Sequence, residues 1–117
     1  MSTQGHERRR FPRYDVVRLP GVLDGFRTFE TLKIGAGGAL IRLPAELTLA
    51  QRVHVSLEMD GHGTFKSPAD IVFVGPDMGA EAAGLFRIGL AFVDTPADES
   101  TRLQRFIARS VAAGEIK

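Results

Sequence analysis

The chain has 117 residues, 44% of them apolar, which is enough for one packed domain and too few for two. Its 15 basic and 14 acidic residues nearly balance, so the overall charge favours neither an anionic nor a cationic partner. The absence of cysteine excludes disulfides and thiolate chemistry, and the absence of a membrane-spanning apolar run or a secretory signal predicts a cytoplasmic protein without membrane insertion.

Residues 1–13 are predicted to form a flexible basic arm. They show no apolar periodicity, and they combine polar side chains with four arginines, Arg8, Arg9, Arg10 and Arg13. The remainder, residues 14–117, is predicted to fold as one unit.

Short apolar runs separated by turn residues predict six strands between Tyr14 and Val93. Their expected ranges are 14–23, 28–34, 39–43, 51–59, 64–74 and 85–93. The fourth is the clearest, because apolar and polar residues alternate strictly from Val53 to Met59. Pro68 lacks an amide donor, so the fifth strand is expected to be an edge strand or bulged there.

A helix is predicted after Val93. Thr95 is expected to cap it, with Pro96 as its first residue and Gly114 at its end. Its apolar positions recur at helical spacing: Leu103, Phe106, Ile107 and Val111. The predicted fold is therefore mainly β, within the α+β class: a small antiparallel six-stranded barrel with a C-terminal amphipathic helix packed on it.

The residues that could carry catalysis or bind a metal are scattered. His6, His54 and His62 show no metal-ligand spacing, so we expect no metal site and no enzymatic activity. The glycine-rich run 35–38 is followed by a strand-like segment instead of a helix, which predicts a tight turn and not a phosphate-binding loop.

The arginine cluster of the arm is the local exception. Guanidinium groups donate paired hydrogen bonds to phosphate and to the O6 and N7 atoms of guanine, so the cluster indicates an anionic nucleotide ligand. Its nearby acids are Glu7 and Asp15. The alternative is a solvated basic arm without a ligand.

Three segments resemble the PilZ domains, bacterial receptors for cyclic di-GMP. The sequence ERRRFPR, residues 7–13, resembles their RxxxR arm, which Arg9 and Arg13 match. Residues 34–41 resemble the second motif, (D/N)xSxxG, and residues 86–94 resemble the penultimate strand. The resemblance covers residues 7–107 and implies a six-stranded antiparallel barrel with a C-terminal helix.

The resemblance also implies a ligand site. Arg9 and Arg13 would clamp phosphate and guanine, and Arg8 occupies a position that influences how many ligand molecules bind. Alignment on Gly38 places Lys33 where the family has Asp or Asn, and Gly35 where it has Ser. Lys33 cannot accept a hydrogen bond from guanine, and Gly35 has no side chain.

The resemblance implies a small receptor that binds cyclic di-GMP without another cofactor and relays it to a protein partner in motility, pilus or polysaccharide control. The alternative, which Lys33 and Gly35 favour, is an interaction module that docks on its partner without the nucleotide. A nucleic-acid-binding barrel is disfavoured, because the strand region offers no exposed aromatic pair for stacking bases.

Overall fold

The structure, a computed structural model, describes residues 12–16, 19–78 and 84–116. Its elements in chain order are β1 (Tyr14–Asp15), β2 (Pro20–Leu23), β3 (Arg27–Gly35), β4 (Gly38–Leu43), β5 (Arg52–Met59), β6 (Gly63–Pro76), β7 (Phe86–Phe92) and α2 (Ala97–Ala112). Most of the predicted arm, residues 1–11, lies outside the described part of the chain.

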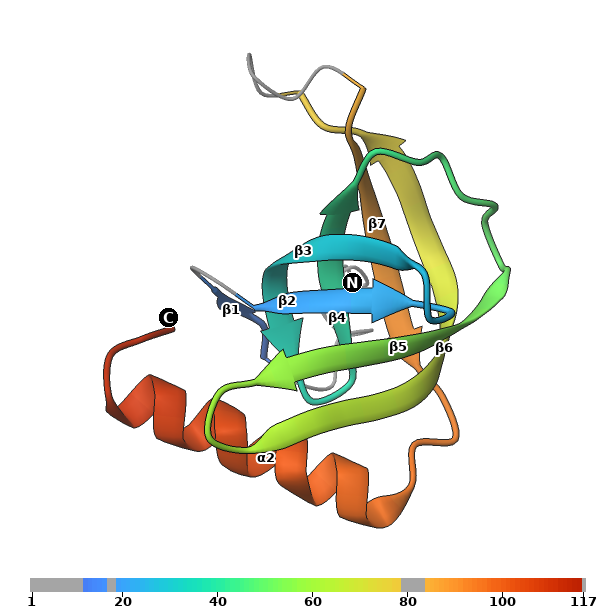
Figure 1. Ribbon diagram of the computed structural model, residues 1–117. Coiled ribbons are helices and arrows are strands. Elements are labelled where there is room, and N and C mark those ends of the chain that lie inside the picture. Colours follow the sequence, from blue (N-terminus) through green and yellow to red (C-terminus); the bar gives the residue numbers. More distant parts are fainter. Residues whose placement is uncertain (1–11, 17–18, 79–83, 117) are drawn as a thin grey trace, which may run out of the picture.

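The strands from β2 to β7 close into a barrel (Figure 1). Neighbouring strands run β3-β2-β5-β6-β7-β4, all antiparallel, and the additional pairing of β3 with β4 completes the circle. The prediction of a six-stranded antiparallel barrel with a C-terminal helix is confirmed, and the structure adds one short strand, β1.

The first predicted strand, residues 14–23, is divided into β1 and β2. Both pair with β3, with Asp15 opposite Lys33 and Pro20 opposite Glu30. Four residues, 16–19, therefore separate the two strands, whereas only residues 31 and 32 separate their partners on β3. A single strand could not pair continuously with β3 across four residues on one side and two on the other. The prediction of one strand over residues 14–23 was therefore wrong.

The expectation of an edge strand or a bulge at Pro68 is confirmed in part, because residues 63–68 pair with β5 and the ladder with β7 begins only at Ala69. β6 pairs with β5 on one side and β7 on the other, and its register shift lies between Ile71 and Phe73. The Pro68 carbonyl accepts a hydrogen bond from the Val93 amide at 3.0 Å, so its backbone faces β7 where that ladder begins. The missing donor is tolerated because Pro68 lies just before the ladder with β7, where β6 has β5 as its one paired neighbour.

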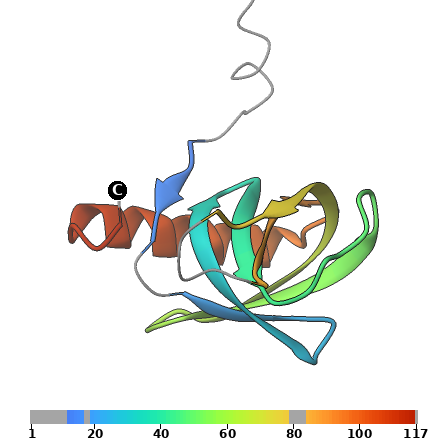
Figure 2. The ribbon, with the colours of Figure 1, turned by 90° about the horizontal axis from the view of Figure 1, so that it is seen from above.

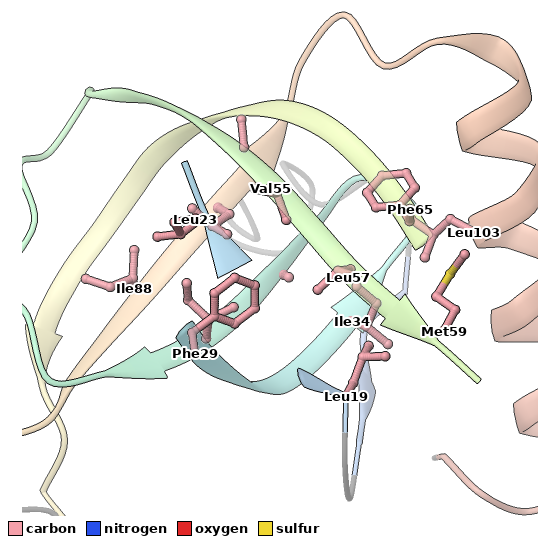
Figure 3. Packing of buried hydrophobic residues seen from close by; sticks show 14 of the residues in the cluster. Leu19, Leu23, Phe29, Ile34, Val55, Leu57, Met59, Phe65, Ile88 and Leu103 are labelled. Atoms are coloured by element: carbon pink, nitrogen blue, oxygen red, sulfur yellow. The ribbon is translucent and has the colours of Figure 1, made fainter. Parts of the chain in front are cut away.

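Apolar side chains that alternate along the strands fill the barrel (Figure 3). Val53, Val55, Leu57 and Met59 of β5 are buried, as their alternation predicted. Leu103 extends the core into α2, from which it points toward Phe65 and Met59. The helix therefore covers one end of the barrel and belongs to the same core.

Helix α2 begins one residue later than predicted and ends as predicted. Pro96, not Thr95, is its N-cap residue, and the Thr95 hydroxyl instead hydrogen-bonds the Ser67 hydroxyl at 2.7 Å. At the C-terminus Gly114 has φ +76°, and the Glu115 amide donates to the Ser110 carbonyl at 2.8 Å, which is the Schellman geometry.

The buried face of α2 comprises Leu103, Phe106, Ile107 and Ser110. Val111 was expected on this face, but it is 40% exposed and Ser110 takes its place. Beyond the helix, Ile116 pairs with Val16, and Figure 2 shows β1 above the C-terminal half of α2. No helix in the described ranges has the length and apolar character needed to cross a membrane.

Candidate functional site

Two faces of β1 carry different chemistry. Tyr14 packs against the core and lies opposite the buried Ile34 of β3, so both belong to the inner side. Side chains alternate across a strand, so Arg13 and Asp15 belong to the outer side. Lys33 is the register partner of Asp15, and Gly35 follows it by two residues on β3. We call Arg13, Asp15, Lys33 and Gly35 the β1–β3 face.

An ion pair crosses this face. Lys33 Nζ donates to Asp15 Oδ1 at 2.8 Å, and both side chains remain accessible, at 46% for Lys33 and 71% for Asp15. Cross-strand partners of opposite charge contribute modestly to stability when they are this exposed. The pair therefore fixes two charged groups at the surface without burying either of them.

Gly35 lets the end of the arm approach the barrel. A Cβ atom at Gly35 would lie 2.6 Å from the Pro12 carbonyl oxygen and 3.4 Å from Arg13 Cγ. The backbone of Pro12 cannot yield as a flexible side chain can, so any side chain at position 35 would push residues 12 and 13 outward. The absence of a side chain at Gly35 thus leaves the room that lets Arg13 lie beside β3.

Gly38 has a structural role in the closure of the barrel. Gly35 and Gly38 pair across the two-residue turn of Ala36 and Gly37, as the predicted tight turn requires. A Cβ atom at Gly38 would overlap the Leu90 carbonyl oxygen of β7. This contact explains the glycine through packing between β4 and β7, without reference to a ligand.

The structure thus brings together Arg13, Lys33 and Gly35 from the predicted site and places Gly38 at the adjoining turn. Arg8 and Arg9 lie outside the described residues. Asp15 is an addition that the motif did not indicate. Its two-residue spacing from Arg13 could have placed it on the same strand face, but its position opposite Lys33 depends on the register of β1 with β3.

An apolar groove of about 420 Å³ lies on the other side of β1. Pro12, Tyr14 and Ala36 line one wall, and Ile107, Ala108 and Val111 of α2 line the other. Tyr14 and Gln104 are the polar side chains among the lining residues, and neither carries a positive charge that would attract a phosphate. The β1–β3 face is therefore the part of this region that is chemically suited to an anionic ligand.

A second charged cluster lies on β3, β4 and β7. The Asp77 carboxylate is 2% exposed and accepts hydrogen bonds from Arg42 Nη1 at 3.0 Å and Arg87 Nε at 3.3 Å. The hydrogen bond from Arg42 to Glu30, and then the one to Asp77, raise the pKa of Arg42 above its ordinary value. The cluster ties the residues after β6 to the barrel wall.

The histidines do not gather. His54 is exposed on β5, and the His62 ring contacts Phe106 edge-on, with ring centroids 5.6 Å apart. Within residues 12–16, 19–78 and 84–116, no three potential metal-ligating side chains of His, Asp or Glu come together.

A model of the PilZ domain family matches residues 7–109. No curated protein matches the sequence at a significant level. The PilZ domain of YcgR from Escherichia coli, solved with c-di-GMP, superposes with a TM-score of 0.74 and 19% identity over 92% of this chain and 94% of that one.

Two further structures share the fold. MrkH from K. pneumonia, solved in complex with c-di-GMP, has a TM-score of 0.75 and 15% identity over 91% of this chain and 52% of its own. The inhibitor of motility MotI from Bacillus subtilis has a TM-score of 0.71 and 17% identity over 90% and 52% of the respective chains. The chain spans about half the length of MrkH and MotI, and 47% of the longer YcgR chain.

Proposed function

Because the chain belongs to the PilZ domain family, we propose that it is a receptor for cyclic di-GMP that relays the level of this second messenger to a protein partner. The family consists of receptor and adaptor domains, not enzymes. Two proteins of the same fold, YcgR and MrkH, were solved with c-di-GMP, which supports the choice of ligand.

The single observation that carries the proposal is the position of Arg13. It is the second arginine of the RxxxR motif, and the side chain of Arg13 lies against Gly35, on the same β1–β3 face as the accessible side chain of Lys33. A guanidinium and an ammonium group on one accessible face suit the phosphates of a cyclic dinucleotide. Arg9, with Arg8 before it, would complete the clamp from the arm.

The partner would belong to motility, pilus or polysaccharide machinery. MotI, of the same fold, is named as an inhibitor of motility, which supports the first of these. We place the protein in the cytoplasm, where the nucleotide would reach it.

A second function, an interaction module that needs no nucleotide, has its own supporting observation. Lys33 is already engaged with Asp15, and the space that a side chain at position 35 would fill is occupied by the Pro12 carbonyl. Because the groups of this surface are already paired or packed against one another, the surface would present the same shape to a protein partner with or without a nucleotide.

Titration calorimetry of the full chain with cyclic di-GMP at two salt concentrations separates the two functions. The receptor should release or absorb heat in a saturable titration, and its affinity should fall as salt is raised, because exposed cations bind the phosphates. The absence of binding at both salt concentrations would contradict the receptor and leave the nucleotide-independent module.

A further inference from the structure

The β1–β3 face offers hydrogen-bond donors and one acidic acceptor. Arg13 and Lys33 carry donors only, and Gly35 has no side chain. Asp15 is the carboxylate among these four residues, and it is 71% exposed. Any ligand group that must donate a hydrogen bond to a side chain of this face therefore has to donate to Asp15.

A guanine base needs such an acceptor. It presents O6 and N7 as acceptors, which arginine or lysine can satisfy, but N1–H and N2–H₂ as donors. Adenine presents an unprotonated N1 at the corresponding position. A carboxylate that accepts from the N1–H and N2–H₂ edge of guanine would instead oppose its lone pairs to those of adenine N1.

The register of the sheet places Asp15 for this role. It lies directly opposite Lys33, two residues from Arg13 on the same side of β1. Lys33 Nζ holds Oδ1 at 2.8 Å, and a carboxylate retains further lone pairs when one oxygen is engaged. The ammonium group also offsets the charge of the carboxylate, which would otherwise repel the phosphates of the ligand.

We infer that Asp15 is the guanine-selecting residue of this site, and that Lys33 is a positioning residue that orients and neutralises it. The inference rests on the proposed function, since it concerns which base of a cyclic dinucleotide the β1–β3 face prefers. Arg13 supplies attraction for the phosphates, and Asp15 distinguishes guanine from adenine.

Removal of Asp15 should change the affinity for cyclic di-GMP in opposite directions, depending on whether Asp15 acts only as a charge or also binds guanine. If Asp15 is only a negative charge near the ligand, Asp15→Ala should strengthen the binding of every cyclic dinucleotide. If Asp15 reads guanine, Asp15→Ala should weaken cyclic di-GMP by about 10- to 100-fold, the range of one good base contact. Cyclic di-AMP should then bind the variant as well as the wild type, or better.

The experiment is a calorimetric titration of cyclic di-GMP and cyclic di-AMP into the wild type, Asp15→Ala and Asp15→Asn. Asp70→Ala is the matched control, because Asp70 is an accessible carboxylate of β6 that pairs with Arg52 away from the β1–β3 face. The expected result is a loss of guanine preference in Asp15→Ala, a smaller loss in Asp15→Asn, which keeps one acceptor oxygen, and unchanged preference in Asp70→Ala. Thermal unfolding checks that each variant is folded.

Lys33→Met provides a second measurement. It should weaken both dinucleotides, because it removes a cation, and it should also reduce the preference for guanine, because Asp15 loses the contact that orients it. An unchanged guanine preference in folded Lys33→Met would overturn the positioning role of Lys33. An unchanged or increased guanine preference in folded Asp15→Ala and Asp15→Asn would overturn the role of Asp15 and leave the receptor function intact. Failure of the wild type to bind cyclic di-GMP would instead overturn the receptor function, and this inference with it.

Discussion

Arg13 is positioned by contacts that do not require a folded arm. Its Cγ lies beside Gly35, and the chain continues directly into β1. Arg13→Ala should weaken cyclic di-GMP binding by about 1.5 to 3 kcal/mol, the scale of a lost charge-assisted contact, and leave the free energy of unfolding nearly unchanged. Calorimetry and denaturant unfolding measure the two quantities separately.

The control for Arg13→Ala is Arg52→Ala. Arg52 is 52% exposed and pairs with Asp70 on β5 and β6, so it tests the loss of one surface cation outside the β1–β3 face. Equal binding by the wild type and both variants would place the ligand elsewhere on the molecule.

Asp77 presents a different situation, since its carboxylate is buried between two arginines. Arg42 and Arg87 are register partners on β4 and β7, and without Asp77 two like charges face each other. Asp77→Ala should lower the free energy of unfolding by about 1 to 3 kcal/mol, below the full value for a buried pair because both arginines remain partly accessible. Asp70→Ala, at an exposed pair, should cost less than about 1 kcal/mol. Equal urea midpoints for the two variants would contradict the structural role of Asp77.

Residue identities predicted part of the candidate site. The motif spacing grouped Arg13, Lys33 and Gly35, and the structure brings them together on β1 and β3. The pairing of Lys33 with Asp15 depends on strand register, and the overlap of a Gly38 side chain with Leu90 depends on the approach of β7. Neither relationship is local in the sequence, so local patterns could not predict them.

Among the elements, predictions succeeded where local pattern and tertiary environment agree. The alternation of β5 gives one face to the core, and Gly114 ends α2 because the left-handed conformation suits glycine. Predictions failed where the pairing between strands differs from what the local apolar pattern indicates. The segment 14–23 is apolar enough for one strand, but its pairing with β3 divides it into β1 and β2.

Helix α2 contributes to the barrel core through Phe106, which is 9% exposed and contacts the His62 ring. Phe106→Ala should lower the free energy of unfolding by about 3 to 5 kcal/mol, through lost burial and the cavity left behind. Val111→Ala is the control on the same helix, since Val111 is 40% exposed, and it should cost less than about 1 kcal/mol. A melting temperature of Phe106→Ala equal to that of Val111→Ala would show that the helix stabilises the barrel little.

At the scale of the whole molecule, the closed barrel leaves each strand from β2 to β7 paired on both sides. The six strands of the barrel and the terminal helix could be predicted from turn spacing and periodicity. The pairing of β4 with β7 could not, because it joins strands that are distant in the sequence and depends on the curvature of the entire sheet.

A ligand that binds the folded state alone must stabilise it by mass action. Cyclic di-GMP at one hundred times its dissociation constant should add about 2.7 kcal/mol to the free energy of unfolding. For a domain of this size this corresponds to a rise in melting temperature of roughly 10 °C or more. A thermal scan with and without the ligand measures it, and Arg13→Ala should reduce the rise at the same ligand concentration. A melting temperature that does not respond to saturating ligand would contradict binding to the folded barrel.

The bridge between Val16 and Ile116 has a mechanical consequence. Val16 directly follows Asp15, and Ile116 follows the last turn of α2 by only a few residues. Val16 lies one residue after Asp15 and three residues after Arg13. A force on the outer face of β1 at either residue is therefore passed through the bridge to the segment that follows the C-terminus of α2. A displacement of β1 at the β1–β3 face would therefore strain this bridge, and through it the segment that follows α2.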